Sequence, residues 1–97
     1  TAPRMSKKPS RFYQNFNCMY FTYILRSEKN NRYYIGYAYN LEERIAYHNN
    51  NRVIATKNKG PWSLFYFERF EQESDAIRRE RQLKSWKSRK AIEKLKF

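Results

Sequence analysis

Apolar and aromatic residues first dominate the chain between residues 20 and 26, with few polar residues among them, and this pattern predicts a β-strand. Successive side chains of a strand point to opposite faces. One face would carry Phe21, Tyr23 and Leu25, and the other would carry Tyr20, Thr22 and Ile24. Because both sets are rich in apolar groups, we expect both faces of this strand to be at least partly covered.

Two further stretches have strand composition. Residues 33–38 are aromatic and branched, and the polar residues 27–32 before them are typical of a hairpin connection. We therefore expect the second strand to pair antiparallel with the first. A third strand is predicted over 62–70, which is rich in aromatic residues, with its centre at 63–68.

The spacing of apolar residues changes to a helical period after the second strand, and this predicts a helix over 41–48. Asn40 is a suitable N-cap, and Glu43 three residues later completes a capping-box pattern. Arg44 and His48 are four residues apart, so they would share one face of the helix near the second strand.

The C-terminal third of the chain is predicted to be helical. A helix over 75–86 would be capped by Ser74, and a last short helix bearing Ile92 and Leu95 would be capped by Ser88. The inward side of the longer helix is expected to carry Ile77, Glu80, Leu83 and Lys84, with Arg78, Arg79 and Arg81 turned elsewhere.

These elements predict an α+β fold in which a three-stranded antiparallel sheet is flanked by helices. The polar residues between the first helix and the third strand form the longest loop. Residues 1–18 lack periodicity and are interpreted as a flexible basic arm, in part non-native, before one domain over 19–97. A chain of 97 residues has room for one domain with a modest core.

The charge balance narrows the class of partner. The chain has 21 Lys and Arg against 9 Asp and Glu, a formal net charge of +12. Such a charge favours a polyanion, either nucleic acid or an anionic membrane surface. No apolar run approaches the roughly 20 residues that span a bilayer, which disfavours the membrane. Cys18 is the only cysteine, so an intrachain disulfide is excluded and a reducing, cytoplasmic location is expected.

Several short motifs resemble a known family. Tyr34-Ile35-Gly36, preceded by Tyr23 and followed by Arg44 and His48, resembles the GIY-YIG nuclease domain. Three segments are similar to the small stand-alone bacterial members, which are like the catalytic domain of an excision-repair nuclease: Tyr23-Ile24-Leu25-Arg26-Ser27, Pro61-Trp62 and Arg81-Gln82-Leu83-Lys84-Ser85-Trp86-Lys87. The resemblance covers nearly all of the chain from Met19 onward.

The resemblance implies a set of catalytic residues. Tyr23 and Tyr34 would lie beside the attacking water, with Tyr23 as the proton acceptor and His48 assisting it. Arg44 would hold the scissile phosphate, a task that suits its planar, permanently charged guanidinium. Glu80 would bind one Mg²⁺ or Mn²⁺ through a single carboxylate, with water and phosphate oxygens completing the shell. No organic cofactor is implied.

Glu80 also stands out from spacing alone, because it occupies the helical stripe where an apolar residue is expected. A carboxylate there is costly unless it is paired or bound to a metal. The alternative to metal binding is a salt bridge to Arg44 or another nearby arginine. For the other candidates, the alternatives are strand packing for Tyr23 and Tyr34, a solvated charge for Arg44 and a helix-end residue for His48.

The chain departs from the family pattern in places. Phe21 stands at the glycine of the first motif, and Tyr37 stands where some relatives have a lysine near the phosphate, a role that Lys84 or Lys57 could take. His48 occupies a position that is tyrosine in some relatives. An unperturbed histidine would titrate at about 6 to 7, and activity would rise through that pH range.

The sequence therefore predicts a divalent-metal-dependent endonuclease acting on DNA in a role such as DNA repair. It would either select DNA by structure, such as single-stranded or branched DNA, or be directed to its target by a protein partner. The alternatives are a non-catalytic nucleic-acid-binding module on the same scaffold and, supported by charge alone, a binder of an acidic protein. The residues expected to contact nucleic acid are Lys57, Lys59, Lys84, Lys87, Arg89 and Lys90.

Overall fold

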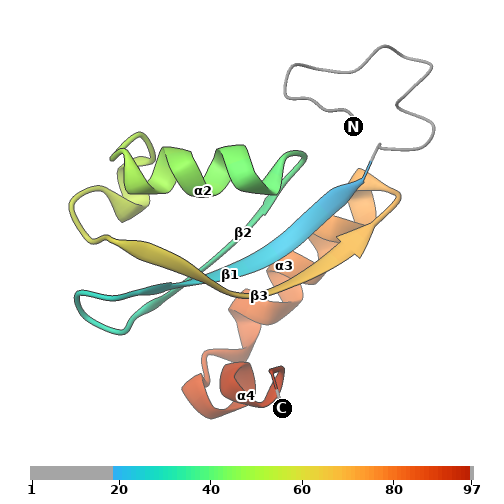
Figure 1. Ribbon diagram of the computed structural model, residues 1–97. Coiled ribbons are helices and arrows are strands. Elements are labelled where there is room, and N and C mark those ends of the chain that lie inside the picture. The colour runs from blue at the N-terminus through green and yellow to red at the C-terminus, as the bar shows by residue number, and fades with distance from the viewer. Residues whose placement is uncertain (1–18, 97) are drawn as a thin grey trace.

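A computed structural model describes residues 19–96, so the predicted basic arm over 1–18 and Cys18 lie outside the described residues. The elements are β1 (Tyr20–Ser27), β2 (Tyr33–Ala38), α2 (Leu41–Asn49), the 3₁₀ turn η1 (Ile54–Thr56), β3 (Trp62–Phe70), α3 (Glu73–Trp86) and α4 (Arg89–Lys94). The strands form one antiparallel sheet in the order β2-β1-β3, with α2 on one face and α3 and α4 on the other (Figure 1). The predicted α+β fold is confirmed.

Strand β1 is central and is covered on both faces, as its alternation predicts. Tyr23 pairs with Gly36 of β2 on one side and with Phe67 of β3 on the other. Ile24 and Leu25 are both fully buried although they point to opposite faces. Side chains on both faces of β1 are therefore buried in the core.

Each face of the sheet has its own apolar cluster. Under α2 the buried residues are Tyr23, Leu25, Ala38 and Trp62, with Tyr34, Leu41 and Ile45 packed against them. Under α3 and α4 the buried residues are Ile24, Leu83 and Ile92, with Tyr33, Ile35, Phe65, Tyr66, Trp86 and Leu95 packed against them. The candidate tyrosines 23 and 34 therefore belong to the face that α2 covers.

Both ends of α2 are held by asparagine side chains. Asn40 is the N-cap, and its Oδ1 accepts a hydrogen bond from the Glu43 backbone at 3.0 Å, as predicted. The Glu43 carboxylate accepts instead from the hydroxyl of Tyr47, one turn later. At the other end, the Asn49 side chain bonds both backbone groups of Trp62, at 2.6 Å to N and 3.1 Å to O. These bonds tie the helix end that bears His48 to the start of β3.

The loop before β3 is more ordered than its polar sequence predicts. Residues 54–56 form the η1 turn, in which Thr56 is buried. Ser27, predicted to lie in the hairpin turn, is the buried last residue of β1, and its hydroxyl donates to the Lys59 carbonyl at 2.6 Å. The bond forms because a buried hydroxyl needs a hydrogen-bond partner, and it holds the loop against the hairpin.

Three details of the α3 prediction are wrong. The helix begins at Glu73 and its N-cap is Gln72, which makes no side-chain capping bond, so Ser74 is not the cap. Lys84 is turned to solvent, with its side chain 51% exposed. Arg79 points inward instead, because a carboxylate on β3 offers it a partner.

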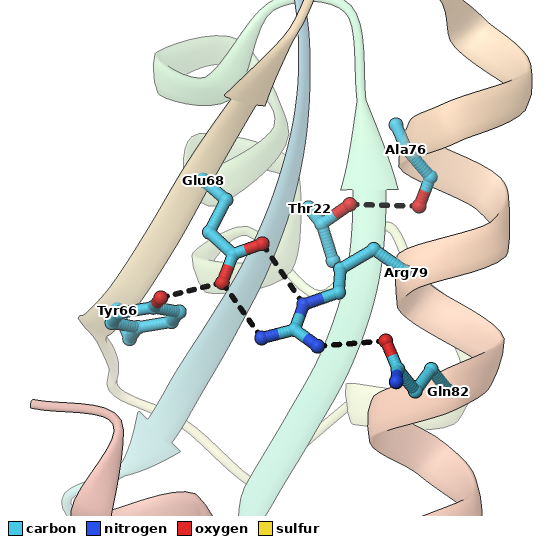
Figure 2. A network of polar contacts seen from close by, with 6 residues as sticks. All are labelled: Thr22, Tyr66, Glu68, Ala76, Arg79 and Gln82. Atoms are coloured by element: carbon cyan, nitrogen blue, oxygen red, sulfur yellow. Dashed lines mark hydrogen bonds and ion pairs between the residues drawn. The ribbon is translucent and has the colours of Figure 1, made fainter.

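That partner is Glu68, and the contact fixes how α3 lies on the sheet (Figure 2). Arg79 Nε and Nη2 donate to the two oxygens of Glu68 at 2.9 and 3.0 Å, and Tyr66 donates to the same carboxylate. Closer to the helix start, the Thr22 hydroxyl donates to the Ala76 carbonyl at 2.7 Å. Because Glu80 follows Arg79 directly, this bidentate contact also sets the direction of Glu80.

Helix α4 matches its prediction. Ser88 is the N-cap, its hydroxyl oxygen accepts from the Ala91 backbone at 3.2 Å, and Ile92 is buried. Among the residues that the structure describes, no helix has the length and apolar character needed to cross a membrane.

Candidate active site

Three aromatic rings meet where α2 crosses the sheet. The centroids of Tyr34 and His48 are 4.8 Å apart, those of Tyr23 and His48 are 5.9 Å apart, and those of Tyr23 and Tyr34 are 6.4 Å apart. Tyr23 and His48 are each only 1% exposed. The structure therefore brings together three sequence-predicted candidates from β1, β2 and α2.

Gly36 makes this arrangement possible. A Cβ at this position would lie 2.7 Å from the hydroxyl oxygen of Tyr23 and 3.1 Å from the ring of Tyr34. No side chain fits at such distances without displacing one of the tyrosines. The glycine of the Tyr-Ile-Gly motif thus serves the close approach of the Tyr23 ring to the β2 backbone.

A chain of hydrogen bonds runs inward from Tyr23. Its hydroxyl lies 2.9 Å from His48 Nε2, and His48 Nδ1 lies 2.7 Å from the Thr56 hydroxyl. That hydroxyl donates to the Val53 carbonyl at 3.4 Å, so its oxygen accepts from Nδ1–H. Nε2 is then the unprotonated nitrogen and accepts the hydrogen bond of Tyr23. The result is a neutral histidine whose free lone pair faces the tyrosine hydroxyl.

Burial controls the protonation of both partners. Burial, with a smaller contribution from the positive charge of Arg44, lowers the pKa of His48 to about 4. Burial also raises the pKa of Tyr23, with contributions from Tyr34 and Glu80 that outweigh the opposing effect of Arg44. At neutral pH Tyr23 keeps its proton and His48 is uncharged. The expected titration of His48 at 6 to 7 is therefore wrong for the free protein.

Arg44 and Glu80 lie on two different helices, and the charges of both act on Tyr23. Arg44 is half-buried on α2, and its charge acts on the pKa values of both Tyr23 and His48. Glu80 comes from α3, and after burial and Tyr34 its charge is a further cause that raises the pKa of Tyr23. The charges of Arg44 and Glu80 therefore both act on Tyr23, although the two residues lie on different helices.

Glu80 has a different partner from the arginine considered on sequence grounds. Its carboxylate lies 2.9 Å from Lys84 Nζ, one helical turn later, and its side chain is 15% exposed. No group of three or more Asp, Glu, His or Cys side chains that could hold a metal ion is found among residues 19–96. A lone carboxylate suits Mg²⁺ or Mn²⁺, which keep several waters and share phosphate oxygens, and it does not suit a transition metal that needs several protein ligands.

The predicted nucleic-acid contacts do not form one cluster. Lys57 and Lys59 flank the end of the η1 loop, and the Lys59 ammonium donates to the Ala55 carbonyl. Lys87 and Lys90 are exposed around the start of α4, on the opposite side of the sheet from α2. The Arg89 side chain already has partners within the protein: it donates a hydrogen bond to the Asn31 carbonyl at 2.7 Å and lies over the ring of Tyr33.

Thr56 is the site residue that sequence reasoning missed. It lies in a polar loop eight positions after His48, and no periodicity or motif marks it. Only the fold of the loop into η1 brings its hydroxyl to the imidazole. Its burial to 1% exposure and its two hydrogen bonds identify it as the group that orients His48.

The lowered pKa of His48 predicts a pH dependence of stability. The unfolded chain, with a histidine pKa near 6.5, binds more protons than the folded chain between pH 6.5 and 4. The free energy of unfolding should therefore fall as pH falls through this window, by up to about 1.4 kcal/mol per pH unit from this one group. Urea unfolding at several pH values in this range measures the effect.

The control is His48→Gln, which keeps a polar side chain but cannot titrate. Its stability should vary less with pH than that of the parent across the same window. The difference between the two proteins isolates His48, because the carboxylates are common to both. Parallel curves for parent and variant would contradict the lowered pKa.

Comparison with known proteins shows which family the chain resembles. The sequence profile of the GIY-YIG catalytic domain matches residues 19–95. The UPF0213 protein of Staphylococcus haemolyticus is 40% identical over 69% of this chain and 82% of its own length, and that of Clostridium perfringens is 42% identical over 68% and 71%. The solution structure of the UPF0213 protein BH0048 from Bacillus halodurans is 28% identical, covers 79% of this chain and 81% of its own, and gives a TM-score of 0.50.

Proposed function

This chain belongs to the GIY-YIG catalytic domain family and, within it, to the UPF0213 proteins. We propose that it is an endonuclease that hydrolyses DNA phosphodiester bonds with the help of Mg²⁺ or Mn²⁺. The observation that carries the proposal is the 2.9 Å contact between Tyr23 and an uncharged His48, with Arg44 acting electrostatically on both. Phosphodiester hydrolysis needs an activated water, a cation for the phosphate and stabilisation of the departing oxygen.

Arg44 supplies the phosphate-binding cation. Its guanidinium can bond two phosphate oxygens at once. A phosphate paired with Arg44 also offsets the charge that, after burial, lowers the pKa of His48. Substrate binding would therefore make His48 more basic at the moment when a proton must be accepted.

Tyr23 and His48 supply the path for the proton of the attacking water. Tyr23 cannot accept a proton while it holds its own, because burial keeps its pKa raised. The hydrogen bond to Nε2 removes this obstacle: Tyr23 passes its proton to His48 as it takes one from water. Thr56 holds the imidazole in the tautomer that this transfer requires.

Glu80 is the residue that would hold the divalent cation. When bound, the cation would stabilise negative charge on the phosphate and on the departing oxygen. Lys84 can release Glu80 without leaving a buried charge unpaired, because the lysine side chain is half exposed to solvent. The lone carboxylate then needs only water and phosphate oxygens to complete a hard-cation shell.

The exposed lysines complete the proposal. Lys57 and Lys87 can contact phosphates of DNA beyond the cut without reading its sequence. Target choice then comes from DNA structure, single-stranded or branched as in repair intermediates, or from a protein that directs the nuclease in the cytoplasm.

A cleavage assay tests the function directly. The purified protein is incubated with single-stranded, duplex and branched DNA of one sequence, with Mg²⁺, with Mn²⁺ and with a chelator. Metal-dependent nicking of at least one substrate is expected. Binding without cleavage of any substrate would replace the proposal with the non-catalytic binding module, and absence of both would remove nucleic acid as the partner.

A further inference from the structure

Part of the sheet face that carries Tyr23 is left uncovered by α2. The first residues of β1 and the last residues of β3 extend beyond this helix (Figure 1). Phe21 and Phe67 lie on these ends, with their ring centroids 5.9 Å apart. Phe67 is 44% exposed, which makes it one of the most exposed large apolar residues among those described. This aromatic pair on the candidate active-site face therefore has one exposed ring, Phe67, and one half-buried ring, Phe21.

The strand register joins this pair to the site. Phe67 is the β3 partner of Tyr23, and Arg69 is the β3 partner of Phe21. Directly paired residues of antiparallel strands point to the same face. The exposed Phe67 ring is therefore next to Tyr23 across the ladder, and the Arg69 guanidinium follows one step further along the same face. Arg69 is itself exposed.

We propose that Phe21, Phe67 and Arg69 form a subsite that binds one unpaired base and its phosphate, one nucleotide away from the bond that is cut. Any of the four bases can stack on an exposed aromatic ring, and a neighbouring arginine supplies the phosphate contact. This inference rests on the proposed nuclease function.

The charge of this face favours nucleic acid over another protein copy. No described strand residue that points to the face is acidic. A second copy of a chain with a net charge of +12 would set Arg69 against like charge. A single-stranded polyanion gains from the same charge and also offers bases that are free to stack, whereas the bases of an intact duplex are already stacked on one another.

The test compares two strands of equal charge. Oligothymidylate of about twelve nucleotides and an abasic deoxyribose-phosphate strand of the same length are bound in the presence of a chelator, so that no cleavage occurs. Phe67→Leu removes the ring but keeps an apolar side chain. We expect its affinity for oligothymidylate to fall by about tenfold, with little change for the abasic strand. Phe67→Tyr keeps a ring and should retain the parent affinity for both.

The matched control is Phe65→Leu, the same change on the opposite face of the sheet, where Phe65 packs against Tyr33. It should leave both affinities unchanged. Equal losses on the two strands in Phe67→Leu, or no loss on either, would overturn the stacking subsite while leaving the nuclease proposal in place if the parent still cuts DNA. A parent protein that binds neither strand would also overturn the subsite, and the cleavage assay would then decide the nuclease proposal separately.

Discussion

Replacing Glu80 with glutamine is expected to abolish metal-dependent cleavage while leaving the fold intact. Glutamine is nearly isosteric with glutamate but lacks the charge that holds a hard cation, and losing several kcal/mol of transition-state stabilisation lowers the rate by roughly a hundredfold or more. Within the described part of the chain the Glu80 carboxylate forms its ion pair with Lys84, which is half exposed on the same helix, so the free energy of unfolding should change by about 0.5 kcal/mol or less. Cleavage and urea unfolding on the same preparation measure both effects.

The matched control is Glu93→Gln, which removes a carboxylate from a similar pair, because Glu93 bonds Arg89 four positions before it on α4. Its cleavage rate should equal that of the parent. Binding of DNA to Glu80→Gln without metal should persist or tighten, since a negative charge beside the phosphate is gone. Retained cleavage in Glu80→Gln would exclude Glu80 as the metal ligand, and a large loss of stability would show that its role is structural.

Tyr23→Phe should be the second most damaging single change. The ring that packs against Gly36 and Tyr34 is kept, but the hydroxyl that bonds His48 is lost. If this hydroxyl carries the proton of the attacking water, cleavage should fall by roughly a hundredfold to ten-thousandfold. The orphaned Nε2 of His48 should also lower stability by about 1 to 3 kcal/mol, because a buried acceptor loses its partner.

Tyr33→Phe is the matched control, because it removes a tyrosine hydroxyl from the same sheet outside the candidate site. Tyr33 precedes Tyr34 on β2 and points to the opposite face, where its hydroxyl bonds Glu93 at 3.4 Å. The variant should cleave DNA at the parent rate. Assays well below the melting temperature of each variant exclude unfolding as the cause. If Tyr23→Phe cleaves DNA as fast as Tyr33→Phe, the proton passes through another group.

The sequence alone was sufficient for the three strands, for the antiparallel pairing of the first two and for the first helix, whereas the strand order came from the tertiary structure. The observed bounds of β2 and β3 coincide with the predicted 33–38 and 62–70, and the Asn40 cap forms as its pattern indicates. Alternation and capping are local properties: each is set by residues within a few positions of one another, and burial on both faces reinforces them. The candidate residues came from the resemblance of the motifs around Tyr23, Gly36 and His48 to a known family, and Glu80 also came from its place in the helical spacing.

Contacts between elements could be decided only by the tertiary structure. Arg79 points inward because β3 places Glu68 beside it, and Lys84 then faces solvent, where it pairs with Glu80. The periodicity of α3 alone could not predict that rotation, because an arginine is expected on the surface unless another element places a partly buried carboxylate beside it. Thr56 and the low pKa of His48 depend likewise on a loop folding over the imidazole. The local pattern specifies which residues form each element. The rotation of a helix, the burial of a side chain and its protonation state depend on the residues that neighbouring elements place beside it.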